Sequence, residues 1–191
     1  MICYPYVAIE NTARGIDRYS YLLLSQMKEK QIDVSVVERG KLDHPWKIVA
    51  NEPFLAQKLF STKADLFHAV SPIGAKTAVF TRRKPLVATI HDLIPFKLFE
   101  WSPMKYRYLK FCIKVTALKS DMIVVPFFST KKDIVSIFSL SPKKIKVVNL
   151  GIDLTRFSSR LKVDSETKRI LFFGGAHPII RGGDVLVKAF H

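Results

Sequence analysis

The chain has 191 residues, and 48% of them are hydrophobic and 12% aromatic, which is enough for a packed core and excludes a disordered tail. Lys and Arg number 31 against 16 Asp and Glu, so the formal charge of +15 favours phosphate-bearing partners. Two cysteines, Cys3 and Cys112, lie in apolar stretches without metal-ligand spacing, which favours reduced thiols and a cytoplasmic protein. No signal-peptide pattern opens the chain, and its apolar runs are far below the roughly 20 residues that span a bilayer. We therefore expect any membrane contact to be at the surface.

Short runs rich in valine and isoleucine alternate with segments of helical periodicity. The strands are expected, in chain order, at Ile2–Val7, Asp33–Val37, Asp65–Val70, Leu86–Ile90, Met122–Val125, Ile145–Val148 and Arg169–Phe173. The helices are expected at Ile16–Lys30, Pro53–Lys63, Pro103–Lys119, Lys131–Phe138 and Gly183–His191. This alternation is typical of βαβ units. The predicted fold class is α/β, a Rossmann-like parallel sheet flanked by helices, which binds ligands at the carboxyl ends of its strands.

Helix signals and a change in composition divide the chain. Thr130 and Asp133 form a T-x-x-D capping pair at the start of one predicted helix, and Pro103 suits the first turn of another. From Leu154 to Lys168 the chain is polar and has no apolar period. We expect a first domain over residues 1–153, a linker over 154–168 and the truncated start of a second Rossmann-like domain over 169–191. This last part is too short to bury a core alone.

Two loops after predicted strands carry residues that suit phosphate binding. Gly15 lies between the first strand and the first helix, where glycine lets the backbone approach a phosphate at a helix N-terminus, although an ordinary tight turn also explains it. Gly174 and Gly175 follow the last predicted strand, and Arg181 precedes the last helix. Glycine backbone and an arginine can clamp a diphosphate; the alternative is a flexible loop with a solvated arginine.

Histidines follow two of the predicted strands. His91 and Asp92 come directly after Leu86–Ile90, at the edge of a parallel sheet where ligands bind. His91 can donate to a sugar hydroxyl or stabilise developing charge, with Asp92 orienting it or capping a turn, and a structural role is the alternative. For His68 we favour a structural role, because no second polar group accompanies it in the sequence.

The predicted helix Pro103–Lys119 carries a basic stripe on an otherwise apolar circumference, formed by Arg107, Lys110 and Lys114. Such a stripe can meet anionic lipid headgroups, although a solvated face of a packed helix is the more common explanation. No C-x-x-C pair, H-E-x-x-H motif or serine nucleophile elbow occurs, which leaves metal and acyl-transfer chemistry without support.

The order and spacing of several segments resemble glycosyltransferase family 4, whose members have the GT-B fold of two facing Rossmann-like domains. The segments are Gly15, Pro85–Asp92, Ser129–Ile134, Lys144–Asp153, Ile170–Gly174 and Arg181–Asp184 followed by Ala189–Phe190. The resemblance implies a retaining transferase of hexosyltransferase type, without cofactor or metal, that moves a sugar from a nucleotide-sugar donor to a glycan or lipid-linked acceptor. It is expected in the cytoplasm, peripheral at the inner face of the cell membrane, in cell envelope polysaccharide synthesis.

Residue roles follow from the same resemblance. The first domain would hold mainly the acceptor, His91 would contact the donor sugar, and Gly15 would approach the donor phosphates. Gly174, Gly175 and Arg181 would bind the diphosphate, with Arg181 in place of the usual lysine. The family's acidic donor-binding residues would lie beyond His191, so we expect this chain to be inactive alone and to need a second chain for the missing domain.

Two other functions remain open from the sequence. One is a non-catalytic acceptor-binding or membrane-binding subunit or remnant. The other is nucleic-acid binding, which rests only on the charge and ranks last, because no recognition-helix, RNP or zinc pattern supports it; we expect no nucleic-acid partner.

Overall fold

The computed structural model describes residues 1–7, 15–38, 50–97, 103–152, 154, 170–174 and 178–190. Contacts between residues divide the chain into two units, Met1–Gly151 and Ile152–His191. The predicted linker falls almost wholly outside the described residues, and so does Gly175. The predicted domain boundaries therefore stay predictions.

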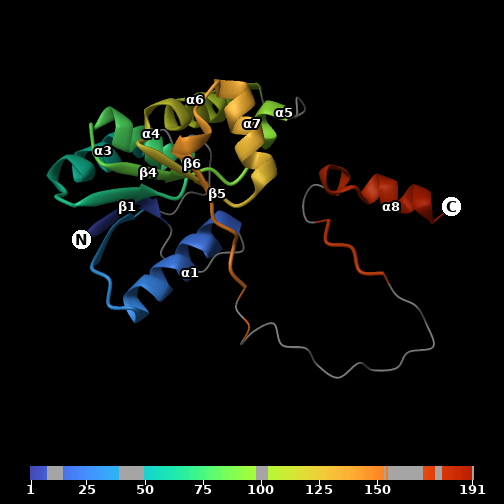
Figure 1. Ribbon diagram of the computed structural model, residues 1–191, viewed down its shortest axis with the longest axis horizontal. Coiled ribbons are helices and arrows are strands. Elements are labelled where there is room, and N and C mark those ends of the chain that lie inside the picture. The colour runs from blue at the N-terminus through green and yellow to red at the C-terminus, as the bar shows by residue number, and fades with distance from the viewer. Residues whose placement is uncertain are drawn as a thin grey trace. The chain divides into compact units, whose positions relative to one another are not determined.

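Met1–Gly151 contains a six-stranded parallel sheet of order β2-β1-β3-β4-β5-β6 (Figure 1). Its strands are β1 (Ile2–Val7), β2 (Val34–Glu38), β3 (Leu66–Ala69), β4 (Leu86–Thr89), β5 (Met122–Val125) and β6 (Ile145–Val147). Every pair of neighbouring strands is parallel. Helices flank the sheet, which confirms the predicted Rossmann-like fold.

Helices cover both faces of this sheet. The helices are α1 (Gly15–Glu29), α3 (Glu52–Ser61), α4 (Pro72–Phe80), α5 (Ile94–Lys97), α6 (Pro103–Lys119) and α7 (Phe128–Phe138), with a 3-10 turn at Pro142–Lys144. Figure 1 shows α1 on one face, and α3, α4, α6 and α7 on the other. Parallel strands buried on both faces explain the continuous apolar runs in the sequence.

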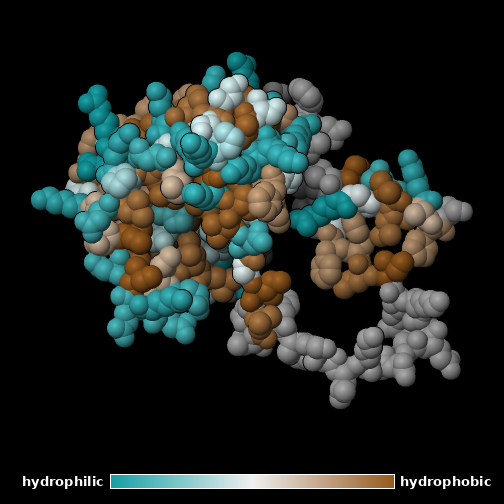
Figure 2. Space-filling model, viewed as in Figure 1, coloured by the Kyte–Doolittle hydropathy of each residue, from teal (hydrophilic) through white to brown (hydrophobic). Residues whose placement is uncertain are grey.

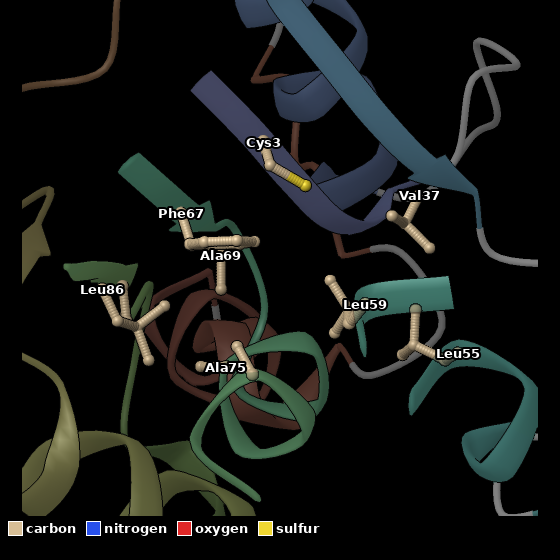
Figure 3. Close-up of a cluster of buried hydrophobic side chains, with 10 residues drawn as sticks. Cys3, Val37, Leu55, Leu59, Phe67, Ala69, Ala75 and Leu86 are labelled. Carbon is tan, nitrogen blue, oxygen red and sulfur yellow. The ribbon is translucent and has the colours of Figure 1, made fainter. Parts of the chain in front are cut away.

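Three hydrophobic clusters fill the space between the layers. In Figure 3, Cys3, Phe67 and Leu86 from three neighbouring strands pack with Leu55 and Leu59 of α3 and with Ala75 of α4. A second cluster joins β5 and β6 to α6 and α7 through residues such as Ile113, Ile123 and Ile134. On the opposite face, Tyr4 and Val70 pack against Leu24 of α1. Both cysteines are buried and free, as predicted from their apolar context.

A buried ion pair joins the helices on the α4 face. The Nζ of Lys76, which is 4% exposed, donates to Glu52 Oε2 at 2.5 Å and to the Tyr108 hydroxyl at 3.1 Å. The Tyr108 hydroxyl also donates to the other oxygen of Glu52. This network links α3, α4 and α6 and satisfies a charge that would otherwise be costly to bury.

Two sequence predictions about helices are wrong. Thr130 and Asp133 do not cap the helix, because α7 begins at Phe128, three residues before the predicted start at Lys131. Phe127 at its N-cap makes no side-chain hydrogen bond. Asp133 instead forms an ion pair with Lys97 of α5 at 2.6 Å. The sequence analysis also missed α4, which has a Ser71 N-cap that accepts from the Gly74 N–H and Pro72 in its first turn. Because α4 is buried on most sides, it lacks the polar face that periodicity detects.

The unit Ile152–His191 contains a 3-10 turn at Ile179–Arg181 and helix α8 (Gly183–Ala189). None of its described side chains is buried. The strand predicted at Arg169–Phe173 is wrong for its described part, because Ile170–Phe173 has no strand structure. A strand is held by hydrogen bonds to a neighbouring strand, and the described residues of this unit offer none.

Candidate functional site

Polar and aromatic side chains gather on the α1 face of the sheet. Neighbouring strands contribute Tyr4 from β1, His68 from β3 and Thr89 from β4. Tyr19 of α1 and His91, which follows β4, complete what we call the tyrosine–histidine cluster. The rings of Tyr4 and His68 lie 5.2 Å apart, and those of Tyr19 and His91 lie 4.9 Å apart. Thr89 and His91 lie at the carboxyl end of β4, and the carboxyl ends of the strands are where parallel α/β sheets bind ligands.

His91 is a half-buried side chain with a free hydrogen-bonding position. Tyr19 meets its ring at 82°, an edge-to-face contact. The Nε2 atom is buried and has no hydrogen-bond partner among the described residues. Burial lowers the pKa of His91, and this outweighs a hydrogen bond with the Val70 backbone and the charge of Asp92, which both raise it. The imidazole is therefore neutral near pH 7.

His68 has a polar partner that the sequence did not reveal. Its Nε2 lies 3.0 Å from Thr89 Oγ1 on the neighbouring strand. Burial lowers the pKa of His68 to about 4. The sequence argument that His68 has no polar companion is thus wrong, because pairing of β3 with β4 supplies Thr89. A buried histidine bonded to a strand neighbour still fits a structural role.

Asp92 caps a turn. Its Oδ1 accepts a hydrogen bond from the Ile94 N–H at 3.0 Å, at the start of α5. Of the two roles that the sequence allowed for Asp92, the geometry fits the capping role.

Gly15 is the first residue of α1 and is exposed. A Cβ added there would meet nothing within 4 Å, so packing within the described residues does not require glycine. Gly15 precedes Tyr19 by four residues, about one helical turn, and Tyr19 contacts His91. The structure thus brings the helix start and His91 to the same edge of the sheet.

Gly174 and Arg181 belong to the other unit. A Cβ added to Gly174 would lie 2.6 Å from a ring carbon of Phe172 and 3.1 Å from the Pro178 side chain, so a larger residue there would require the Phe172 ring to move. Arg181 is exposed and ends the 3-10 turn before α8. The predicted diphosphate clamp stays a prediction, and Gly175 lies outside the described residues.

The sequence analysis missed three members of the cluster: Tyr4, Tyr19 and Thr89. Tyr4 is fully buried, its hydroxyl has no hydrogen-bond partner among the described residues, and burial raises its pKa to about 12. Burial also raises the pKa of Tyr19, against a hydrogen bond with Thr89 that lowers it. Tyr19 follows Gly15 by four residues, about one helical turn, and this spacing was a sequence signal for Tyr19. The others required knowledge of which strands are neighbours.

No group of three or more His, Cys, Asp or Glu side chains that could hold a metal ion occurs within the described ranges. The described helices include none that is both long enough and apolar enough to cross a membrane.

A parallel sheet with helices on both faces defines a Rossmann-like domain. The sequence model of Glycosyltransferase Family 4 matches residues 13–156, which cover β2 to β6 and the tyrosine–histidine cluster except Tyr4. The chain belongs to glycosyltransferase family 4.

Among solved structures, the chain is similar to the crystal structure of Anabaena Alr3699/HepE in complex with UDP and glucose. The two share 14% sequence identity with a TM-score of 0.49, and the match covers 81% of this chain. The chain spans 45% of the length of that protein. No curated protein matches the chain.

Proposed function

We propose that this chain is the acceptor-side part of a retaining glycosyltransferase that moves a hexosyl group from a nucleotide-sugar to a hydroxyl of a glycan or lipid-linked acceptor. The bond between the anomeric carbon and the diphosphate breaks, a bond to the acceptor oxygen forms, and the acceptor hydroxyl proton passes to the leaving diphosphate. Family membership supports the transferase class. Retention, the donor and the acceptor class rest on the family resemblance of the sequence.

The observation that carries the proposal is the free Nε2 of His91. The atom is buried without a partner among the described residues, at the ligand-binding edge of the sheet. A buried polar atom without a hydrogen bond is costly, so a ligand that supplies one gains free energy. A sugar hydroxyl is a ligand group that supplies this bond.

The lowered pKa of His91 sets its role. With the Val70 backbone as partner of one ring nitrogen, a neutral imidazole presents its other nitrogen, Nε2, as an acceptor for a hydroxyl proton. The edge-to-face ring of Tyr19 fixes the imidazole plane against α1. His91 therefore positions the donor sugar or the acceptor beside the start of α1, where Gly15 leaves space for a phosphate.

The rest of the reaction needs more protein than this chain. We propose that a second domain, from further sequence or a second chain, binds the nucleotide-sugar, and that Gly174, Gly175 and Arg181 belong to that half. Stabilisation of the leaving diphosphate would come from these groups and helix N-termini, without a metal or cofactor.

The test is a His91→Ala substitution in a protein completed by a family 4 nucleotide-sugar-binding domain, assayed for transfer from a panel of nucleotide-sugars. We expect kcat/KM to fall by about 10²–10³-fold, because the oriented contact to the reacting sugar is lost. We expect the free energy of unfolding to change by less than about 1 kcal/mol, because His91 is half-buried and its Nε2 has no hydrogen bond for the substitution to break.

The matched control is His68→Gln, at the second histidine of the cluster. Its bond to Thr89 makes it structural, so this substitution lowers stability and has little effect on transfer by the folded protein. Equal losses of transfer and stability in His91→Ala would make His91 structural as well. If the completed protein transfers no sugar at all, the chain is a non-catalytic binding subunit. The basic stripe along Pro103–Lys119 favours this alternative.

A further inference from the structure

The outer face of α6 alternates exposed apolar and basic side chains along its whole length. Met104, Phe111 and Leu118 are 66%, 47% and 42% exposed, and exposed Arg107 and Lys114 lie between them. These positions follow one another at spacings of three and four residues, so they share one side of the helix. The opposite side is buried: Ile113 belongs to the hydrophobic cluster that includes β5 and β6, and Cys112 is fully buried. We call the five exposed residues the α6 face.

Exposed aromatic rings also occur on neighbouring helices, and the one on α4 extends this face. Phe80, at the end of α4, is 61% exposed and stacks on Phe111, with ring centroids 6.4 Å apart. Phe60, at the end of α3, is 63% exposed and lies under the Arg83 guanidinium at 5.5 Å. Figure 2 shows apolar and hydrophilic residues intermixed over this helical layer. A cluster of exposed aromatic rings is unusual on a face that meets only water and marks an interaction surface.

The charge on this surface is predominantly positive, and the adjoining Asp121 carboxylate is paired with Lys84. Helix α6 contains no Asp or Glu, and neither does α4 with the Thr81–Lys84 segment that follows it. The nearby carboxylate of Glu52 is already held by Lys76 and Tyr108. The surface therefore attracts an anionic partner, and a second copy of the chain would bring like charges together.

The alternation of apolar and cationic residues distinguishes among anionic partners. Nucleic acid calls for cations with polar or base-stacking groups, and exposed Met104 and Leu118 gain little from it. At a bilayer surface, apolar side chains enter the boundary between headgroups and acyl chains, while Arg and Lys meet lipid phosphates. Each exposed residue of the α6 face has a partner there.

We propose that the α6 face, together with Phe80, lies on an anionic bilayer surface. Helix α6 follows the carboxyl end of β4, so its Met104 end lies towards the sheet edge that holds His91. The headgroup of a lipid-linked acceptor would then project from the bilayer beside the tyrosine–histidine cluster. This last link rests on the proposed function, whereas binding to the bilayer does not depend on sugar transfer.

The experiment is co-sedimentation of the full chain with vesicles of phosphatidylcholine and with vesicles in which phosphatidylglycerol replaces part of it. We expect binding to the anionic vesicles alone, weakened by added salt. Arg107→Gln with Lys114→Gln lowers the partition coefficient about thirtyfold, because each cation near an anionic surface contributes separately. Phe80→Ser with Phe111→Ser lowers it about tenfold and leaves the salt dependence in place.

Matched controls change the same residue types elsewhere on Met1–Gly151. Lys28→Gln with Lys30→Gln removes two exposed cations at the end of α1, on the other face of the sheet, and Phe128→Ser removes a 72% exposed ring at the start of α7. We expect both controls to bind vesicles within about twofold of the parent chain. Thermal unfolding of each variant establishes that it is folded.

Three results would overturn the proposal. Equal losses in the α6 face and control variants would mean that binding follows overall charge. Tighter binding to a DNA duplex than to anionic vesicles, lost in the same variants, would assign the face to nucleic acid. A dimer in solution that Phe80→Ser with Phe111→Ser dissociates would assign it to a second copy. None of these results depends on a transfer assay, so the proposed function is tested separately.

Discussion

Strand β5 in Met1–Gly151 and the run Ile170–Phe173 in Ile152–His191 are similar in composition and differ in surroundings. Ile123 of β5 is fully buried between β4 and β6, whereas Leu171 and Phe173 are 76% and 74% exposed. Both runs favour extended structure, yet only the first is a strand. The comparison teaches that an apolar run becomes a strand where neighbouring strands take up its backbone hydrogen bonds.

Large-to-small substitutions should give the largest contrast between the two regions. We expect Ile123→Ala to lower the free energy of unfolding by about 2–5 kcal/mol, because it leaves a cavity in a closed core. Leu171→Ala is expected to change it by less than about 0.5 kcal/mol, because the side chain is already in water. Chemical denaturation of each variant measures both values. Comparable losses would mean that Leu171 packs in a core, and the contrast would be wrong.

Acid should lower the stability of Met1–Gly151 through buried His68. The pKa of His68 is about 4 in the folded chain and 6.5 ordinarily, so the unfolded chain binds more protons between these values. Stability present above pH 6.5 is therefore lost as the pH falls to 4, by about 1–3 kcal/mol for this residue. Denaturation across this range should show a smaller loss in His68→Gln. An identical pH dependence in both proteins would show that burial of His68 does not contribute.

Removing the described turn and helix of the second region should have the smallest effect. Because none of the described side chains of Ile152–His191 is buried, deletion of all residues after Lys168 should change the stability of the first region by less than about 0.5 kcal/mol. The melting temperature should shift by less than about 2 °C, with cooperativity unchanged. Differential scanning calorimetry measures both. Loss of a cooperative transition would place the domain boundary elsewhere.

Where local pattern and tertiary context agree, the sequence was a good guide. The observed bounds of β1, β5 and α6 are those predicted, because continuous apolar runs and a proline at a first helical turn are local signals. The sequence predictions failed where packing or strand pairing with distant segments determines the secondary structure. A buried helix such as α4 has no polar face to reveal its period, and Ile170–Phe173 has no neighbouring strand in the described part of its unit.

The candidate site divides in the same way. His91 and Gly15 could be proposed from the sequence, because a residue's place after a strand or before a helix can be read along the chain. Tyr4, Tyr19 and Thr89 were missed because their meeting depends on the order of the strands and on which face α1 covers. The role of Asp92 as a turn cap likewise needed coordinates.

By itself, the sequence determined the α/β class, the parallel sheet, the family and the position of His91 after the carboxyl end of β4, because hydrophobic period and strand-to-loop order are properties of neighbouring residues. The tertiary structure alone decided that the Nε2 of His91 is buried without a partner in the described chain, that His68 meets Thr89, and that Phe80 joins the α6 face. These facts depend on which distant segments the fold brings together, because burial and hydrogen bonding are set by the residues that lie nearby in space.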